Sequence, residues 1–345
     1  MTSAERERVE GFGSLQDGLL QASDWYLWGP YVSERQWGTV REDYSADGQA
    51  WDYLPHDAAR SRAYRWGEDG LAGFCDIEQR LCLGLALWNG HDPILKERLF
   101  GLTGEQGNHG EDAKEYWWYS DALPSHAWNR WRYHYPQGEF PYSDLVDENG
   151  RRGRHDPEYE LLDTGAFDED RYWIVEVDYA KAAPHDVLMR VRITNAGPDA
   201  AALHVLPTAW FRNTWSWEPG AQKPALRVTD TGLALVHPRF GDLELLAGAA
   251  PDGARPVGLA CDNETNVARL FGAVPPTSSV YPKDGIGDHV VGGNLTVNPE
   301  GVGTKGALWY QASVDPGQTV EFRLRLRPAG GQEEGDALGK DFESV

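Results

Sequence analysis

The second half of the chain consists of successive segments in which apolar and polar residues alternate with a period of two. Side chains of a β-strand point to opposite faces in turn, so this pattern is typical of strands with one buried and one solvated face. Short clusters of Gly, Pro, Asp and Asn separate the segments, such as Ala-Gly-Pro-Asp at 196–199. The apolar positions of the four clearest segments are Trp173, Val175, Val177 and Tyr179; Val187, Met189, Val191 and Ile193; Leu203 to Phe211; and Val320, Phe322, Leu324 and Leu326.

Strands that follow one another without intervening helices pair antiparallel and bury their apolar faces between two sheets. We therefore predict a mainly β protein, an antiparallel sandwich with few short helices. One such helix is expected from Pro93 to Leu102, where a proline opens an apolar pattern and a glycine lies near its end.

The charge balance excludes two classes of partner. Lys and Arg number 32 against 54 Asp and Glu, which gives a net charge of −22. Such a chain repels phosphate backbones and anionic lipid headgroups, so we expect no nucleic acid and no membrane among its partners.

Other whole-chain features predict a cytoplasmic protein. No stretch approaches the ~18 consecutive apolar residues of a membrane span, and residues 1–10 lack the apolar core of a secretory signal. The three cysteines, Cys75, Cys82 and Cys261, are too few for a disulfide framework.

Sequence motifs for cofactors and metals are missing. Gly11-Phe-Gly13 lacks the third glycine of a dinucleotide-binding loop, and there is no Walker sequence and no Gly-x-Ser-x-Gly elbow. No His-Glu-x-x-His occurs, and the ten histidines are scattered. The oxygens of Asn108-His-Gly-Glu-Asp112 could bind a cation, although a polar loop is the simpler interpretation. We expect neither a cofactor nor a metal.

Aromatic residues are unusually frequent, with 15 Trp, 15 Tyr and 10 Phe, and several lie beside carboxylates. Aromatic faces stack on sugar rings, and glycosidic-bond cleavage needs one protonated and one ionised carboxyl group. The composition thus permits glycosidase chemistry, although the same residues also fit turns, ion pairs and sandwich cores. The candidate residues are Trp37, Arg41, Asp43 and Tyr44 in a first cluster, Trp66, Glu68 and Asp69 in a second, and Lys283, Asp284, Asp288 and His289 in a third.

The three clusters lie in longer motifs that follow one another along the chain: WGPYVSERQWGTVREDYS (28–45), RWGEDGLAG (65–73), NHGED (108–112), WFRNTWSW (210–217), CDNETN (261–266) and KDGIGDHVV (283–291). Together they resemble the opening part of bacterial proteins of glycoside hydrolase family 63, relatives of processing α-glucosidase I and of mannosylglycerate hydrolase-like enzymes. The resemblance extends from about Trp25 to Pro328.

The resemblance implies an enzyme of two parts, an N-terminal β-supersandwich and a C-terminal toroid of six helical hairpins. In the family the general acid and base both lie on the toroid and invert the anomeric carbon. No residue of this chain matches those catalytic positions, so we expect no catalytic residue in it. We expect an N-terminal helical or flexible segment at 1–24, the β-supersandwich at 25–328, and at 329–345 a linker with the start of a helical catalytic domain that this chain lacks.

The resemblance thus predicts the β-sandwich domain of an inverting α-glycosidase, with the toroid and an oligosaccharide or glycoside substrate as partners. The three clusters would close the interdomain interface or line the substrate pocket. A free-standing carbohydrate-binding module, with a groove of two or three coplanar tryptophans, is an alternative. A self-sufficient inverting hydrolase is another, and it requires two carboxyl groups ~6.5–9.5 Å apart across an open cleft.

Overall fold

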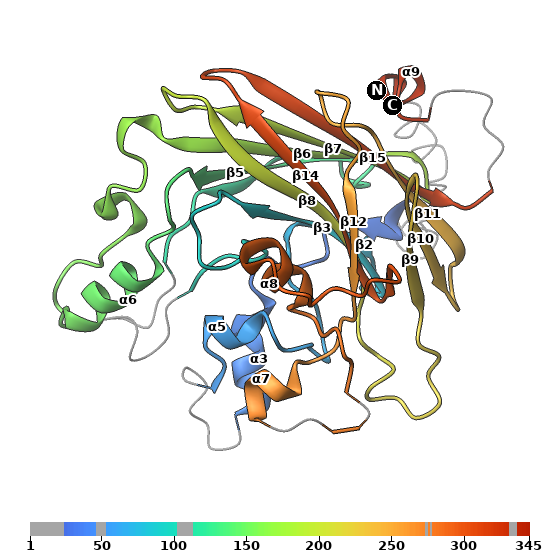
Figure 1. Cartoon of the computed structure of the whole chain (residues 1–345), viewed down its shortest axis with the longest axis horizontal. Coiled ribbons are helices and arrows are strands. Elements are labelled where there is room, and N and C mark those ends of the chain that lie inside the picture. Colours follow the sequence, from blue (N-terminus) through green and yellow to red (C-terminus); the bar gives the residue numbers. More distant parts are fainter. Residues whose placement is uncertain (1–23, 46–52, 102–112, 273–274, 277, 331–336) are drawn as a thin grey trace.

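The computed structural model describes residues 24–45, 53–101, 113–272, 275–276, 278–330 and 337–345. In this part of the chain two antiparallel β-sheets, of nine and six strands, pack face to face (Figure 1). The predicted mainly β fold, an antiparallel supersandwich with few short helices, is therefore confirmed. None of the described helices is long and apolar enough to cross a membrane.

The nine-stranded sheet contains most of the alternating segments. Its strand order is β13-β9-β10-β11-β15-β7-β6-β5-β4. The strands are β4 (Trp117–Ala122), β5 (Trp128–Pro136), β6 (Tyr172–Ala183), β7 (Asp186–Asn195), β9 (Ala225–Thr229), β10 (Gly232–His237), β11 (Gly241–Ala247), β13 (Val302–Gly303) and β15 (Thr319–Pro328).

The six-stranded sheet packs on one face of the nine-stranded sheet. Its order is β1-β2-β3-β8-β14-β12, so strands from both ends of the described chain meet in it. The strands are β1 (Trp28–Gly29), β2 (Leu71–Asp76), β3 (Leu81–Trp88), β8 (Ala201–Phe211), β12 (Val257–Cys261) and β14 (Lys305–Val314).

The main core lies between the two sheets. The apolar positions that alternation predicted in β6, β7 and β15 are buried in it, except Val320, which is partly buried against it; Trp131, Tyr133 and Tyr135 of β5 are buried there too. The opposite face of β5 to β7 bears charged pairs between strands, for example Arg130 with Asp178 at 2.6 Å. The alternation therefore identified the buried face of these strands correctly.

The six-stranded sheet is covered on both faces, since nearly every residue of β2 and β3 is buried. Its second face carries a layer of loops and short helices, on the lower side of Figure 1. The layer includes α3 (Gln36–Tyr44), α5 (His56–Ala59), α7 (Val267–Phe271) and α8 (Gly285–Gly292), and α6 (Tyr142–Arg151) lies beside it. The described residues also form three short 3-10 helices: η1 (Asp24–Tyr26), η3 (Leu161–Thr164) and η4 (Asp168–Asp170).

The helix predicted from Pro93 to Leu102 is wrong, because the described part of this segment contains no helix: it has bends and pairs with the sheet at one residue, Lys96. In the pairing of β2 with β3, Leu71 lies opposite Leu85, and no β2 residue pairs with Leu87. Lys96 fills that place: the backbone N–H groups of Lys96 and Leu87 each donate to the other's carbonyl at 2.9 Å. Pairing with the sheet therefore outweighs the local helical pattern.

The C-terminal segment lies on the outer face of the nine-stranded sheet, where α9 (Lys340–Ser344) follows β15 (Figure 1). Arg323 of β15 donates to the carbonyl oxygen of Leu338 at 3.2 Å, and its guanidinium lies 5.2 Å from the ring centre of Phe342. The proposed start of a helical domain at 329–345 remains a prediction, and residues 1–23 lie outside the described part.

Candidate functional site

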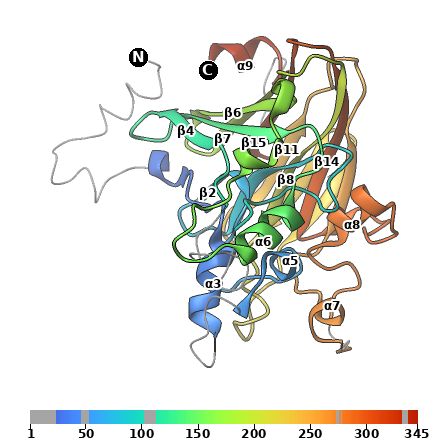
Figure 2. The same cartoon turned by 90° about the vertical axis from the view of Figure 1, so that its left-hand side faces the viewer.

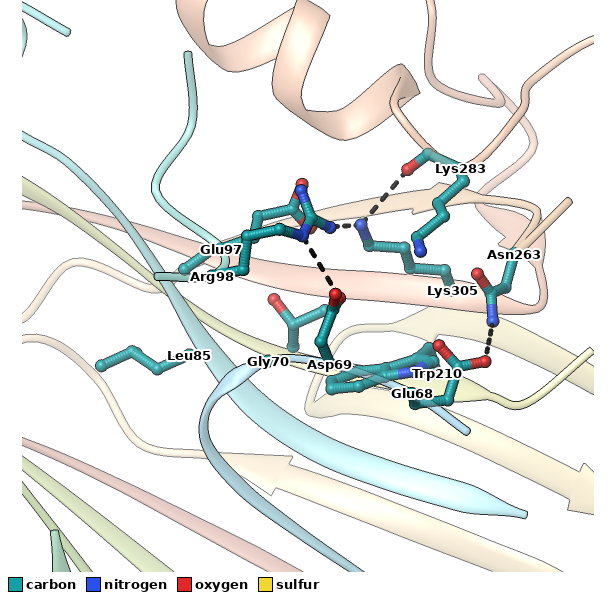
Figure 3. A pocket seen from close by; sticks show the side chains of 12 residues that line it. Glu68, Asp69, Gly70, Leu85, Glu97, Arg98, Trp210, Asn263, Lys283 and Lys305 are labelled. Carbon is teal, nitrogen blue, oxygen red and sulfur yellow. Dashed lines mark hydrogen bonds and ion pairs between the residues drawn. The ribbon is translucent and has the colours of Figure 1, made fainter. Parts of the chain in front are cut away.

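The outer face of the six-stranded sheet is hollowed at its centre, because small residues of neighbouring strands lie there. Gly84 of β3 and Gly70, just before β2, both face the ring of Trp210. An added Cβ would come within 3.0 Å of that ring at Gly84 and 2.8 Å at Gly70. Neither position has room for a larger residue, so the tryptophan lies flat over the sheet and charged side chains fill the space above it (Figure 3).

Acidic and basic side chains from distant segments form a buried charge network in this space (Figure 3). Arg98 donates to Asp69 at 3.2 Å, and both side chains are almost fully buried. Lys305 of β14 donates to Glu97 at 2.5 Å and to the backbone carbonyl of Lys283 at 3.2 Å. The network thereby ties the segment before β2, the segment after β3, β14 and the start of α8 together.

The side chains of Lys283 and Asn263 also belong to the charge network. The Lys283 ammonium donates to the carbonyl of Arg62 at 2.8 Å and lies 4.0 Å from the ring centre of Tyr64. The Asn263 amide donates to Glu68 at 2.9 Å, whereas its Oδ1 atom is buried and accepts no hydrogen bond in the described structure. The remaining cavity is about 20 Å³, enough for roughly one water molecule.

Burial and neighbouring charges shift the titration of the charge network in opposite directions. Burial raises the pKa of Glu68 to about 6, although the Lys283 ammonium acts against this. Burial also lowers the pKa of Lys283, and the carboxylates of Asp69 and Glu68 offset only part of the effect. The pKa of Glu97 lies below its ordinary value, because Lys305 and other cations outweigh the effect of burial.

A carboxyl group whose pKa is raised to about 6, with a second carboxyl group beside it, has one feature of an acid–base pair. Hydrolysis of a glycoside, however, requires space for a sugar and a water molecule between the two carboxyls. Glu68 and Asp69 are 1% and 6% exposed, and both have polar partners within the protein. In the described residues this network ties the helical layer to the sheet and leaves no space for a sugar between Glu68 and Asp69.

The third predicted cluster begins at α8, which caps the edge of the charge network. Asp284, at the N-terminus of α8, is buried and accepts from Ser61 at 2.6 Å and from Arg269 of α7. Arg269 also donates to Asp288 at 2.6 Å. Most of the KDGIGDHVV motif therefore lies in a helix, which two ion pairs of Arg269 fasten to α7.

The structure brings five of the candidate residues into or next to the charge network: Trp37, Glu68, Asp69, Lys283 and Asp284. Trp37 is buried in α3, and its backbone N–H donates to Asp69 at 3.3 Å. Asp288 lies at the edge, as described above.

Two other candidates lie apart from the charge network. The Trp66 side chain is 59% exposed beneath the guanidinium of Arg65. His289 faces the other way, with Nδ1 2.7 Å from the carbonyl oxygen of Asn294 and its ring against Trp309. The side chains of Arg41, Asp43 and Tyr44 lie outside the described residues, and so does the segment 108–112.

Sequence reasoning missed several members of the charge network. Glu97 and Arg98 belong to the segment that was predicted as a helix, so their ion pairs with Lys305 and Asp69 were not considered. Lys305 opens a strand, where a lysine is usually solvated, and a signal for its burial was absent. Asn263 lies inside the CDNETN motif, so the sequence marked its position but did not predict its contact with Glu68.

The described residues contain no group of three or more His, Cys, Asp or Glu side chains placed to hold a metal ion. The three cysteines are free and buried. Cys75 and Cys82 are direct partners in the pairing of β2 with β3.

No protein-family model matches the chain. The chain is similar to the uncharacterized protein YMR196W of the yeast Saccharomyces cerevisiae, with 39% identity over 345 aligned positions. The match covers 90% of this chain and 32% of the yeast protein. The chain therefore spans about a third of the length of the relative it matches.

Proposed function

We propose that this chain is the β-sandwich part of a family 63-like inverting α-glycosidase. Its helical layer packs on a helical toroid that carries the catalytic acid and base, and loops of this layer form one wall of the substrate pocket. The proposal rests on the motif resemblance and on the asymmetry of the sandwich, in which one sheet bears a layer of helices and loops and the other bears charged pairs and the C-terminal segment.

The proposed interface with the toroid rests on one observation, the exposure of apolar side chains on the helical layer. Trp66, Phe271 of α7, Val280 and Leu295 are between 59% and 93% exposed, and each lies in a segment that flanks or forms this layer. A contiguous patch of such side chains is typical of a surface that binds another protein, and we propose that these four contribute to one. The charge network beneath them gives the layer a rigid base.

The internal pairing of the network carboxylates also favours a non-catalytic role. A self-sufficient hydrolase would need two carboxyls across an open cleft. The network leaves space for about one water molecule, and its acids bind cations and amides of the protein. In the proposed enzyme the bond-breaking acids therefore come from the toroid.

The described tryptophans do not favour a flat carbohydrate-binding platform. Trp66 and Trp118 are the tryptophans with more than a third of their surface exposed among the described residues. Trp118 belongs to β4 at the edge of the nine-stranded sheet, whereas Trp66 precedes β2 of the other sheet. A groove of coplanar tryptophans would need both on one surface.

The longer yeast relative offers the direct test. The purified yeast protein and this chain are incubated separately with a panel of α-linked disaccharides, and the products are followed by NMR. We expect the yeast protein to release sugar with the inverted anomeric configuration, and this chain to release none. Hydrolysis at an enzymatic rate by this chain, or retention of configuration by the yeast protein, would refute the proposal.

A further inference from the structure

A second and larger cavity lies between α5 and α6, at the side of the helical layer, where Figure 2 shows both helices. Its volume is about 460 Å³, within the range of about 300–1,000 Å³ that small-molecule sites occupy. None of the candidate site residues predicted from the sequence lies in its wall, and none of the charge-network residues named above lines it. It is therefore a separate feature of the fold.

Aromatic rings form one wall of this cavity. His56 of α5 is 7% exposed, and its ring stacks on Tyr142 of α6 with centroids 5.7 Å apart. Phe100 meets the His56 ring edge to face at 5.1 Å. A ring face turned away from the stacking contact offers an apolar surface to a ring-shaped ligand, as a binding pocket requires.

Two polar atoms of the same wall have no partner. Nε2 of His56 and the hydroxyl oxygen of Tyr142 are both buried, and neither makes a hydrogen bond within the described structure. Buried polar groups are almost always paired, because leaving one unpaired costs free energy. Both atoms are closed to solvent in this structure, so a ligand hydroxyl would reach them only if the two side chains turn toward the cavity.

The charged residues in the wall disfavour an anionic ligand. They are Arg60, Asp57 and Asp147, one cation and two anions. Arg60 already binds Asp57 at 2.8 Å, which leaves the exposed Asp147 without a neutralising partner among the wall residues. A phosphate or carboxylate would meet a net negative charge there, with its nearest cation already paired.

A cationic ligand is disfavoured by the charges behind the wall. The pKa of His56 lies well below its ordinary value, because of burial first and then of Arg98, Lys96 and Arg60. The imidazole is therefore neutral at physiological pH. The Lys96 ammonium lies 5.5 Å from the ring centre of Tyr142, so a ligand cation on that ring would be repelled.

We propose that this cavity binds a neutral, hydroxylated ring, and that this ring is a glycosyl unit. The choice of a sugar among such rings rests on the proposed function, whereas the cavity and its wall do not. The C–H face of the ring lies against the aromatic wall, on a face that the His56–Tyr142 stack leaves uncovered. Its hydroxyls pair with the free polar atoms of these two residues and with the carboxylate of Asp147 at the rim.

Isothermal titration calorimetry on this chain tests the assignment. Maltose is added up to roughly 20 mM, a range that covers millimolar dissociation constants. We expect saturable heat with maltose and none with glucose 6-phosphate or myo-inositol under the same conditions. No binding of maltose, tighter binding of the phosphate, or equal binding of the polyol would overturn the inference.

Variants of the wall locate the binding. Tyr142→Phe removes the hydroxyl and keeps the ring, and we expect maltose binding to weaken by about tenfold, the usual loss for one hydrogen bond. Val146→Trp fills the cavity and should abolish binding. Ser143→Trp should also abolish binding, and it should disturb folding less because Ser143 is an exposed residue of the same wall. Val236→Trp, on β10 and 47% exposed, is the matched control and should bind as the parent does. Unchanged binding in both blocking variants would overturn the inference.

The two proposals can fail separately. Binding is measured on this chain, whereas hydrolysis is measured on the longer yeast relative. Maltose binding without hydrolysis would refute the glycosidase and leave the cavity site standing. Hydrolysis without binding would refute the cavity site and leave the glycosidase standing.

Discussion

Replacing Glu68 by glutamine tests whether the charge network is a structural device. The pKa of Glu68 in the folded protein is about 6, against an ordinary value of 4.5. One pKa unit corresponds to about 1.4 kcal/mol, so ionising this carboxyl costs the folded state about 2 kcal/mol more than the unfolded chain. Glu68 is 1% exposed, so solvent screening does not reduce this figure much.

The sign follows from the raised pKa. Glu68 contributes full stability below about pH 4.5, and this contribution is lost as the pH rises through about 6. Glutamine does not ionise, and its Oε1 atom can still accept from Asn263. The free energy of unfolding of Glu68→Gln relative to the parent should therefore increase by about 2 kcal/mol between about pH 4 and pH 8.

Urea unfolding followed by tryptophan fluorescence at several pH values measures this difference. Glu97→Gln is the matched control, because the Glu97 side chain is only 12% exposed and its pKa is lowered. Glu97→Gln leaves the Lys305 ammonium without its carboxylate, so it should lose about 3–5 kcal/mol at neutral pH and less at low pH. The quantity compared is the free energy of unfolding of each variant relative to the parent. The reasoning would be refuted if this quantity did not change with pH for Glu68→Gln, or if it changed with pH in the same direction as for Glu97→Gln.

Three further outcomes follow from the same contacts. Asp69→Asn leaves the buried Arg98 guanidinium without its carboxylate and should lower the free energy of unfolding by about 3–5 kcal/mol, measured by urea unfolding at neutral pH; a loss below about 1 kcal/mol would contradict the ion pair. In α8, Gly285→Ala should destabilise by at least ~1–3 kcal/mol, because the new Cβ would lie 2.2 Å from a backbone oxygen, whereas Gly287→Ala meets nothing closer than 3.5 Å and should be neutral or stabilising in thermal unfolding. Because all three cysteines are buried, a thiol reagent should modify none rapidly in the native protein and all three after unfolding; a fast-reacting thiol in the native state would contradict their burial.

The sheet elements that alternation identified were predictable because their pattern is local. In β6, every second residue from Trp173 to Tyr179 is apolar, and only one face of a strand can then be buried. The two-sided burial of β2 and β3 has no such signature, since a short apolar run fits either a buried strand or a buried helix. The segment at 93–102 failed for a related reason, because its conformation depends on an open pairing position on β3.

The candidate site was predictable in part. The sequence marked Glu68, Asp69, Lys283 and Asp284 as unusual in strand-rich surroundings, and the structure places them together or side by side. It did not indicate Glu97 or Lys305, because an ion pair between residues 208 positions apart leaves no local pattern.

By itself the sequence determined the fold class, the buried faces of the main strands and the segments rich in charged and aromatic residues, since period-two alternation and motif composition are properties of neighbouring residues. Only the tertiary structure decided which charges neutralise each other under the helical layer, and that the cavity between α5 and α6 has an aromatic wall with two unpaired polar atoms. These features depend on distances between segments that are remote in the chain, and such distances are set by how the sheets and the layer pack.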